Sequence, residues 1–534
     1  MAIANKQRIA IYDTTLRDGA QGEGISFSVE DKVKIALKLD EFGVDVIEGG
    51  WPGSNPKDID FFARMRQERL KTSRIAAFGS TRRPQIKAQD DRMLQQLLEA
   101  QTPVITLVGK SWDFQVLKAL RIELDENLRM IADTVAFLKS EGRTVYFDSE
   151  HFFDGYKENP TYALACLRAA GESGVDANIL CDTYGGAMPL EVYEIVKSVR
   201  LAQPSYALGI HTHNDGECGV ANALMGVQGG ATQVQGTING YGERTGNANL
   251  TSILPALALK LGFDLLQPGA LGKLSDVSAY VDEISNVAPR NNAAYVGRSA
   301  FAHKAGLHVD GIRKHPKTYE HIDPSEVGNE RRILVSELSG GSTMLEKAEK
   351  YGITLTKGSP ETRAVLNAVA DLEHKGYSFE GAEASFELLV KKVTGGYSPL
   401  FALKGYRVIV EKRGDDVAPI TEATLKIEVD GVEHLTVAEG DGPVNALDGA
   451  LRKALSSFYP ELTKIALSDF KVRVINQAEG TAARVRAIVE SRDRTPGADG
   501  NHRTWSTVGV SENVIEASWK ALVDSIEYGL LRRR

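Results

Sequence analysis

The chain has 534 residues, more than the ~250–300 that one hydrophobic core serves, and its 42% hydrophobic and 25% charged residues are typical of globular proteins. Its formal net charge of −8, from 63 Lys and Arg against 71 Asp and Glu, lacks the basic surplus of nucleic-acid-binding proteins. No apolar run of about eighteen residues predicts a membrane span, no signal-peptide segment is apparent, and three cysteines are too few for a disulfide framework. We therefore expect a cytoplasmic protein that binds neither membranes nor nucleic acid.

The first part of the chain alternates short apolar runs with longer amphipathic stretches. Val29–Phe42 and Glu126–Ser140, for example, place their apolar residues on one helical face. Eight successive β–α units favour an α/β protein with a (β/α)8 TIM barrel over a doubly wound sheet, and we expect this catalytic domain to span residues 1–270. The runs that suit strands buried on both faces are Arg8–Asp13, Val44–Gly50, Arg74–Gly79, Val104–Val108, Thr144–Phe147, Ala177–Cys181, Ala207–Ile210 and Thr232–Gln235.

Helical patterns dominate the next part of the chain, residues 271–400. Helices are predicted over Leu334–Tyr351, Pro360–Gly376 and Gly381–Val393. We expect these residues to form helical linker subdomains rather than another large core.

From about residue 401 the apolar pattern changes to a period of two, which is typical of strands with one buried face. Predicted strands are Tyr406–Glu411, Ala423–Val429 and Phe470–Val474. The pattern repeats in two ββα-like halves that pair strands with a helix: Ala423–Val437 with Val444–Ser457, and Ala482–Val510 with Asn513–Tyr528. Asn445 corresponds to Asn513 in this repeat. We expect residues 401–534 to form a C-terminal α+β domain suited to dimerisation or effector binding.

The active site of a β/α barrel lies at the carboxyl ends of its strands. Polar residues that follow the predicted strands are therefore the candidates for chemistry. They are Arg17 and Asp18, Glu48, Glu150, Thr183, His211 and His213, and the glycine-rich segment 240–247.

His211 and His213 form a His-x-His motif at the end of the seventh predicted strand. Side chains alternate along a strand, so both imidazoles point to the same face. With a carboxylate and an amide oxygen they would form a mixed N/O site that suits Mn²⁺, Mg²⁺ or Zn²⁺ and leaves positions for a substrate. An isolated motif of this kind is more often a pair of core or surface histidines, and its place at a barrel strand end favours the metal site.

Arg17 and Asp18 offer two functions from neighbouring positions. The carboxylate can bind a cation, and the guanidinium can stabilise an oxygen that develops negative charge. Glu150 is a candidate acid or base. For all three residues the alternative is a salt bridge at the barrel rim. The segment 240–247 lacks the lysine of a Walker loop.

Three ordered motifs resemble those of the alpha-isopropylmalate, homocitrate and citramalate synthase family, whose barrel is related to that of 3-hydroxy-3-methylglutaryl-CoA lyase. They are DTTLRDG at 13–19, HTHND at 211–215 and GYGERTGN at 240–247. The resemblance continues through FAHKAGLH at 301–308 and LVSELSG at 334–340. The C-terminal repeat resembles the family's allosteric dimerisation domain, so the resemblance covers nearly the whole chain.

The resemblance implies a metal-dependent condensation. The family joins acetyl-CoA to a 2-oxo acid and then hydrolyses the thioester. By resemblance, Arg17 would stabilise the alkoxide that forms at the keto oxygen of the substrate. The residues implied as ligands of the divalent cation are Asp18, His211, His213 and Asn247.

The resemblance also implies roles outside the metal site. Thr183 would hydrogen-bond the substrate carboxylate. Glu150 matches the family's catalytic carboxylate on the fifth strand, which orients the acetyl group or moves its proton. His308 and Tyr319 are expected to remove the proton of acetyl-CoA or to activate the hydrolytic water.

Two segments most resemble citramalate synthases within the family, EGGWPGSNPKD at 48–58 and FDSEHFFDG at 147–155. This implies pyruvate as the acceptor, and the alternative is 2-oxoisovalerate, as in 2-isopropylmalate synthases. One difference argues against that alternative. Isopropylmalate synthases usually have Glu or Asn and then Gln directly after the Arg-Asp-Gly motif, whereas this chain has Ala20–Gly22 there. Phe78, Leu107 and Tyr184 lie at predicted strand ends, as pocket or core residues.

The resemblance further implies a homodimer, with isoleucine as the feedback inhibitor if citramalate is the product. Three rival functions fit the sequence less well. A lyase of the same superfamily would resemble the barrel alone, and a barrel metallohydrolase typically carries His-x-His on its first strand. A non-catalytic binding protein would lack ligands that Asp18, His211, His213 and Asn247 supply here.

Overall fold

The structure is a computed structural model that describes residues 7–304, 306–334, 359–379, 382–415, 418–475, 483–495 and 503–533. The chain divides into two compact units. The barrel unit comprises Met1–Phe301 and His321–Arg331, and the second unit comprises Ala302–Glu320 and Arg332–Arg534. No helix of the described residues is long and apolar enough to cross a membrane.

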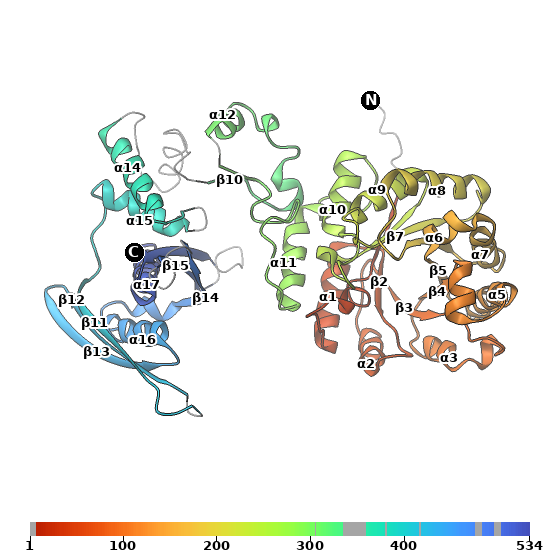
Figure 1. The fold of residues 1–534 in the computed structure, drawn as a ribbon, viewed down its shortest axis with the longest axis horizontal. Helices are drawn as coiled ribbons and strands as arrows, with labels where there is room; N and C mark the ends of the chain where they lie inside the picture. Colours follow the sequence, from red (N-terminus) through yellow and green to blue (C-terminus); the bar gives the residue numbers. More distant parts are fainter. Residues whose placement is uncertain are drawn as a thin grey trace. The chain divides into compact units, whose positions relative to one another are not determined.

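The barrel unit is a closed barrel of eight parallel strands in chain order, which confirms the predicted TIM barrel (Figure 1). Pairing of Ala10 with Gln233 and of Asp13 with Gly236 closes the barrel between its first and last strands. The strands are β1 (Ala10–Asp13), β2 (Val46–Gly50), β3 (Arg74–Ser80), β4 (Val104–Lys110), β5 (Thr144–Glu150), β6 (Ala177–Asp182), β7 (Leu208–Thr212) and β8 (Gln233–Gly236).

Helices surround the barrel and alternate with its strands (Figure 1). The predicted helix Val29–Phe42 is confirmed as α1, since Ser28 and Asp31 form a capping box at its start and Gly43, with φ 98°, ends it. The predicted helix Glu126–Ser140 begins two residues earlier, as α5 (Leu124–Ser140). The other α-helices of the barrel unit are α2 (Pro56–Met65), α3 (Arg92–Glu99), α4 (Asp113–Gln115), α6 (Phe152–Glu158), α7 (Pro160–Glu172), α8 (Pro189–Ala202), α9 (Gly219–Gly229), α10 (Leu250–Pro255) and α11 (Leu274–Ile284).

Two apolar layers follow from the alternation of side chains along the barrel strands. One face of each strand packs on the helices, where Leu107 and Phe147 join the main hydrophobic core. The other face fills the barrel interior, where Tyr12, Ala76 and Tyr146 belong to a separate buried cluster. Leu107 is therefore a core residue, whereas Phe78, on the same strand face as Ala76, belongs to the interior side.

The second unit begins with two short parallel strands, β9 (Ala302–His303) and β10 (Arg332–Ile333), and helix α12 (Gly306–Lys314). The predicted helices Pro360–Gly376 and Gly381–Val393 are confirmed as α14 (Pro360–His374) and α15 (Glu383–Val393). The predicted helix Leu334–Tyr351 lies outside the described residues beyond Leu334.

The C-terminal part contains two three-stranded antiparallel sheets, each followed by one helix (Figure 1). The predicted ββα halves are wrong by one strand each, because the strand preceding each half pairs with it and completes a βββα unit. The two units are β11 (Ala402–Glu411), β12 (Ile420–Val429), β13 (Val432–Gly440) and α16 (Pro443–Leu455), and β14 (Ile465–Val474), β15 (Val485–Asp493), β16 (Thr504–Ser511) and α17 (Val514–Leu531).

The predicted correspondence of Asn445 with Asn513 is also wrong. Asn513 is the N-cap of α17, where its side chain accepts hydrogen bonds from two backbone N–H groups of the first turn. In α16 the N-cap is Gly442, since Pro443 occupies the first helical position. Asn445 therefore lies inside the first turn of α16.

Candidate active site

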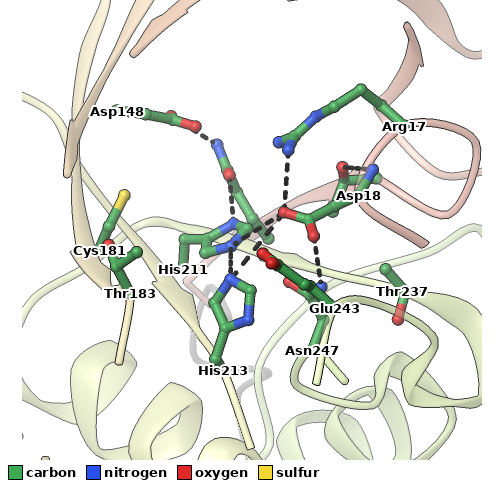
Figure 2. A network of polar contacts seen from close by, with 12 residues as sticks. Arg17, Asp18, Asp148, Cys181, Thr183, His211, His213, Thr237, Glu243 and Asn247 are labelled. Carbon is green, nitrogen blue, oxygen red and sulfur yellow. Dashed lines mark hydrogen bonds and ion pairs between the residues drawn. The ribbon is translucent and has the colours of Figure 1, made fainter. Parts of the chain in front are cut away.

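One end of the barrel brings together an aspartate, two histidines and an asparagine from three separate segments (Figure 2). The ligand-type atoms of Asp18, His211 and His213 lie within 4.8 Å of one another. Asp18 Oδ2 is 3.7 Å from His211 Nε2 and 4.0 Å from His213 Nε2, and the two Nε2 atoms are 3.3 Å apart. All three side chains are buried.

Backbone pairing holds Asn247 next to this cluster. His213 and Asn247 form an isolated antiparallel bridge, and Asn214 N–H donates to the Gly246 carbonyl at 2.9 Å. Gly242 adopts a φ of 147°, and a Cβ there would lie 2.2 Å from Asn247 Nδ2. Gly242 is thus required by its close packing against Asn247.

The buried amide group of Asn247 supports the capacity of the cluster for a metal ion. Asn247 Nδ2 donates to Asp18 Oδ1 at 3.0 Å, while its Oδ1 is buried and has no hydrogen-bond partner in the described part of the chain. A buried carbonyl oxygen without a partner is costly unless it meets a ligand. One carboxylate, two imidazoles and one amide oxygen therefore fit a divalent cation.

Burial and the charges around the cluster keep its side chains in the protonation states that bind metal. Burial opposes ionisation of Asp18, but Arg17, His211 and His213 prevail and lower its pKa to about 2. Burial, and then His211, lowers the pKa of His213 to about 4. Burial also lowers the pKa of His211. At neutral pH the cluster thus holds a carboxylate and two neutral imidazoles, as metal binding requires.

Arg17 lies against the cluster and is held from three sides. Its Nη1 contacts Asp18 Oδ2 at 3.0 Å, its Nε donates to Glu48 Oε2 at 2.6 Å, and its guanidinium lies 3.9 Å from the centre of the Phe78 ring. Glu48 is fully buried and also accepts a hydrogen bond from the Tyr12 hydroxyl at 2.5 Å. Glu48 and Asp18 raise the pKa of Arg17 against the effect of burial, so its charge is permanent.

Thr183 and Glu150 lie at the same end of the barrel but outside the metal cluster. Pairing of Cys181 with His211 places Thr183, which follows β6, near the end of β7 (Figure 2). Its hydroxyl oxygen accepts a hydrogen bond from the His151 backbone N–H at 2.9 Å. Glu150 forms an ion pair with Lys110 at the end of β4, which corresponds to the rim salt bridge considered as its alternative role.

His308 and Tyr319 belong to the second unit. Their rings stack with centroids 4.2 Å apart and an interplanar angle of 29°. Both side chains are exposed. The structure thus brings these two predicted residues together as a pair.

Sequence reasoning named Glu48 as a strand-end candidate but assigned it no role, and it assigned none to Asp148 or Gln235, which are also buried behind the cluster. A carboxylate in an otherwise apolar buried strand is the signal that could have pointed to Asp148. Tyr184 is half exposed and packs against His151, with ring centroids 4.3 Å apart.

Comparison with known proteins identifies the family. The model of the HMGL-like family matches residues 8–281, more than half of the chain. The chain belongs to the HMGL-like family. Two further models match later parts of the chain, the homocitrate synthase post-HMGL domain-like family at residues 295–376 and the LeuA allosteric (dimerisation) domain at residues 380–530.

Three relatives of this HMGL-like protein match it over nearly its whole length. An (R)-citramalate synthase of Geobacter sulfurreducens is 53% identical over 98% of this chain and 97% of its own. An (R)-citramalate synthase of Aquifex aeolicus is 52% identical over 98% of each. A probable 2-isopropylmalate synthase of Methanopyrus kandleri is 31% identical over 99% of each. The relatives confirm the predicted resemblance to the synthase family.

Proposed function

We propose that the protein is an (R)-citramalate synthase, which joins acetyl-CoA to pyruvate and hydrolyses the resulting thioester to release (R)-citramalate and CoA. The observation that carries this proposal is the buried cluster of Asp18, His211 and His213 with Arg17 against it. It is supported by relatives of that name at 53% and 52% identity, against 31% for the probable 2-isopropylmalate synthase.

Asp18, His211, His213 and Asn247 would hold the cation. A divalent metal ion bound there would supply Lewis-acid polarisation of the keto group of the 2-oxo acid. Mn²⁺, Mg²⁺ and Zn²⁺ all suit the mixed N/O donor set.

Arg17 carries the electrostatic part of the condensation. When the acetyl carbon attacks the keto carbon of pyruvate, the keto oxygen gains a full negative charge. Arg17 is permanently charged and is held in place by Glu48, so it stabilises that oxygen without reorganisation. Thr183 contributes a hydroxyl for the pyruvate carboxylate.

Proton transfer falls to residues outside the metal cluster. The acetyl carbon must lose a proton before it can attack, and a thioester is a weak carbon acid, so a positioned base is needed. By family resemblance the candidates for this task are Glu150 in the barrel unit and the His308 and Tyr319 pair in the second unit. After the carbon–carbon bond forms, water attacks the thioester carbon, CoA leaves as the thiol, and the product keeps the new carboxylate.

The C-terminal βββα units are proposed to join two copies of the chain into a homodimer and to bind isoleucine as a feedback inhibitor. The match of residues 380–530 to the LeuA allosteric (dimerisation) domain supports the first part. Sedimentation of the full-length protein tests the dimer, and isoleucine titration of the condensation rate tests the inhibitor.

The deciding experiment measures release of the CoA thiol from acetyl-CoA with Mn²⁺ or Mg²⁺. Pyruvate, 2-oxobutanoate, 2-oxoisovalerate and 2-oxoglutarate are compared as acceptors, with EDTA as the control. We expect metal-dependent turnover to be highest with pyruvate. Preference for 2-oxoisovalerate would replace the proposal with 2-isopropylmalate synthesis, and no thiol release with any acceptor would refute a condensing enzyme.

A further inference from the structure

A buried line of polar side chains runs from the metal cluster across the barrel interior. His211 Nδ1 is 2.9 Å from Gln235 Oε1, and Gln235 Nε2 donates to Asp148 Oδ1 at 3.3 Å. Figure 2 shows the Asp148 and His211 ends of this line. The three residues come from β7, β8 and β5 and are all nearly inaccessible to solvent, with exposed fractions of 5%, 0% and 4%.

The contact with Gln235 decides which nitrogen of His211 carries the proton. A neutral imidazole has one N–H donor and one acceptor nitrogen. When Gln235 presents its carbonyl oxygen, the proton of His211 must be on Nδ1, and the lone pair is left on Nε2. Nε2 is the atom that faces Asp18 and His213, so this tautomer is the one that binds a metal.

Asp148 favours this orientation of the Gln235 amide. Turned by 180°, the amide would direct its NH₂ group at His211 and its oxygen at Asp148 Oδ1 and Gln233 Oε1, so that both atoms would lose the donor they now face. In the observed orientation Asp148 Oδ1 accepts from the NH₂ group, and Gln233 Oε1 lies 3.5 Å from the same nitrogen. The orientation depends on an acceptor oxygen at Asp148.

His213 lacks a comparable support. Its Nδ1 is buried and has no hydrogen-bond partner among the residues that the structure describes. Among the residues that the structure describes, a side chain therefore sets the tautomer of His211 but not that of His213.

We propose that Gln235 is a positioning residue of the metal site, which fixes the tautomer and ring orientation of His211, and that Asp148 orients the Gln235 amide. The inference rests on the metal site of the proposed function. It requires neither a particular acceptor nor a particular product.

The test measures metal affinity directly. Full-length protein is stripped with EDTA and titrated with Mn²⁺ by calorimetry, and bound Co²⁺ is followed by its visible absorption spectrum. In Gln235→Met, which keeps the length of the side chain without its amide, we expect affinity to fall ten- to hundredfold, as is typical when such partners of metal ligands are lost. The Co²⁺ spectrum should change as well.

Gln203→Met is the matched control. Gln203 is another buried glutamine of the barrel unit, and its Nε2 donates to the Leu164 carbonyl at 2.9 Å. Its replacement removes a buried amide of the same kind with no contact to His211. We expect unchanged Mn²⁺ affinity at a comparable loss of thermal stability. Equal loss of affinity in both variants would mean a general structural effect and overturn the inference.

The Asp148 part is tested by a conservative and a non-conservative variant. Asp148→Asn keeps an acceptor oxygen and should stay within about threefold of the original Mn²⁺ affinity, whereas Asp148→Leu should lose about tenfold. Because Asp148 acts through Gln235, the double variant of Gln235→Met with Asp148→Leu should bind no more weakly than Gln235→Met alone. Additive losses, or equal losses in the two Asp148 variants, would overturn this part.

The outcomes separate this inference from the proposed function. Gln235→Met with full Mn²⁺ affinity would overturn the inference, even if the unaltered enzyme condenses pyruvate with acetyl-CoA. Weakened affinity in a protein that fails to use pyruvate would support the inference and refute the function. If the unaltered protein binds neither Mn²⁺ nor Co²⁺, the inference is overturned as well.

Discussion

We predict that Glu48→Gln lowers the turnover number of the condensation about ten- to hundredfold in a protein that remains folded. Glu48 Oε2 accepts from Arg17 Nε at 2.6 Å, and the carboxylate is fully buried. The other charged partner of Arg17 is Asp18, which a bound cation would also engage. Glu48 is therefore the anion that holds the guanidinium in place when metal and substrate are present.

The magnitude follows from this one contact. A hydrogen bond to a charged group contributes about 1.5–3 kcal/mol, and each 1.4 kcal/mol or so of lost transition-state stabilisation is tenfold in rate. Glutamine keeps the shape of Glu48 but removes the charge that pairs with Arg17. An alanine would instead break a buried ion pair at a cost of about 3–5 kcal/mol and endanger the fold, so glutamine is the sharper test.

The assay is CoA thiol release at saturating metal, acetyl-CoA and pyruvate, with thermal unfolding to verify the fold. Asp91→Asn is the matched control, because Asp91 is equally buried and pairs with Arg83 while it caps α3. Asparagine caps helices as well as aspartate does, so this control should keep its turnover. A turnover of Glu48→Gln within twofold of the original would refute the idea that Glu48 positions Arg17.

EDTA should abolish thiol release, and added Mn²⁺ or Mg²⁺ should restore it, because the proposed role of the cation is to polarise the keto group. Thiol release that persists after complete chelation would contradict the metal site. In the metal-free protein, burial and then His211 lower the pKa of His213 to about 4, below the value of 6.5 in an unfolded chain. As the pH falls, His213 is therefore protonated in the unfolded chain before it is protonated in the folded protein. The free energy of unfolding should therefore fall by about 3 kcal/mol between pH 6.5 and 4, and urea unfolding of His213→Asn should lack this loss. Phe78→Leu should raise turnover of 2-oxoisovalerate relative to pyruvate about tenfold, since a smaller side chain beside Arg17 admits a larger acceptor; an unchanged ratio would exclude Phe78 from the acceptor pocket.

The barrel could be predicted because each of its strands is recognisable from its own short stretch of sequence. Strands that are buried on both faces read as continuous apolar runs, and all eight predicted runs became barrel strands. Both ends of the helix Val29–Phe42 were predicted correctly, since Ser28 precedes its first residue and Gly43 follows its last. Pairing of parallel strands then places every strand end, and so every candidate ligand, at one end of the barrel.

The C-terminal domain was predicted less well because strand partnership is not local. β11 and β14 show the period of two, but nothing in their own residues shows that each pairs with the following hairpin. The mismatch of Asn445 and Asn513 has a similar origin. Both asparagines precede an apolar helical pattern, and only the proline at position 443 distinguishes the true start of α16.

The same contrast separates the proposed metal ligands from the residues behind them. His211 and His213 are two positions apart on one strand, so the period of a strand alone predicts that their imidazoles converge. Glu48, Asp148 and Gln235 make contacts that span the barrel interior, and Asp148 and Gln235 are 87 residues apart in sequence. Such contacts depend on how far each strand is staggered against the next, which no single strand reveals. Candidate ligands can thus be predicted from the chain, whereas the groups proposed to set their tautomer and orientation can be recognised only in the closed barrel.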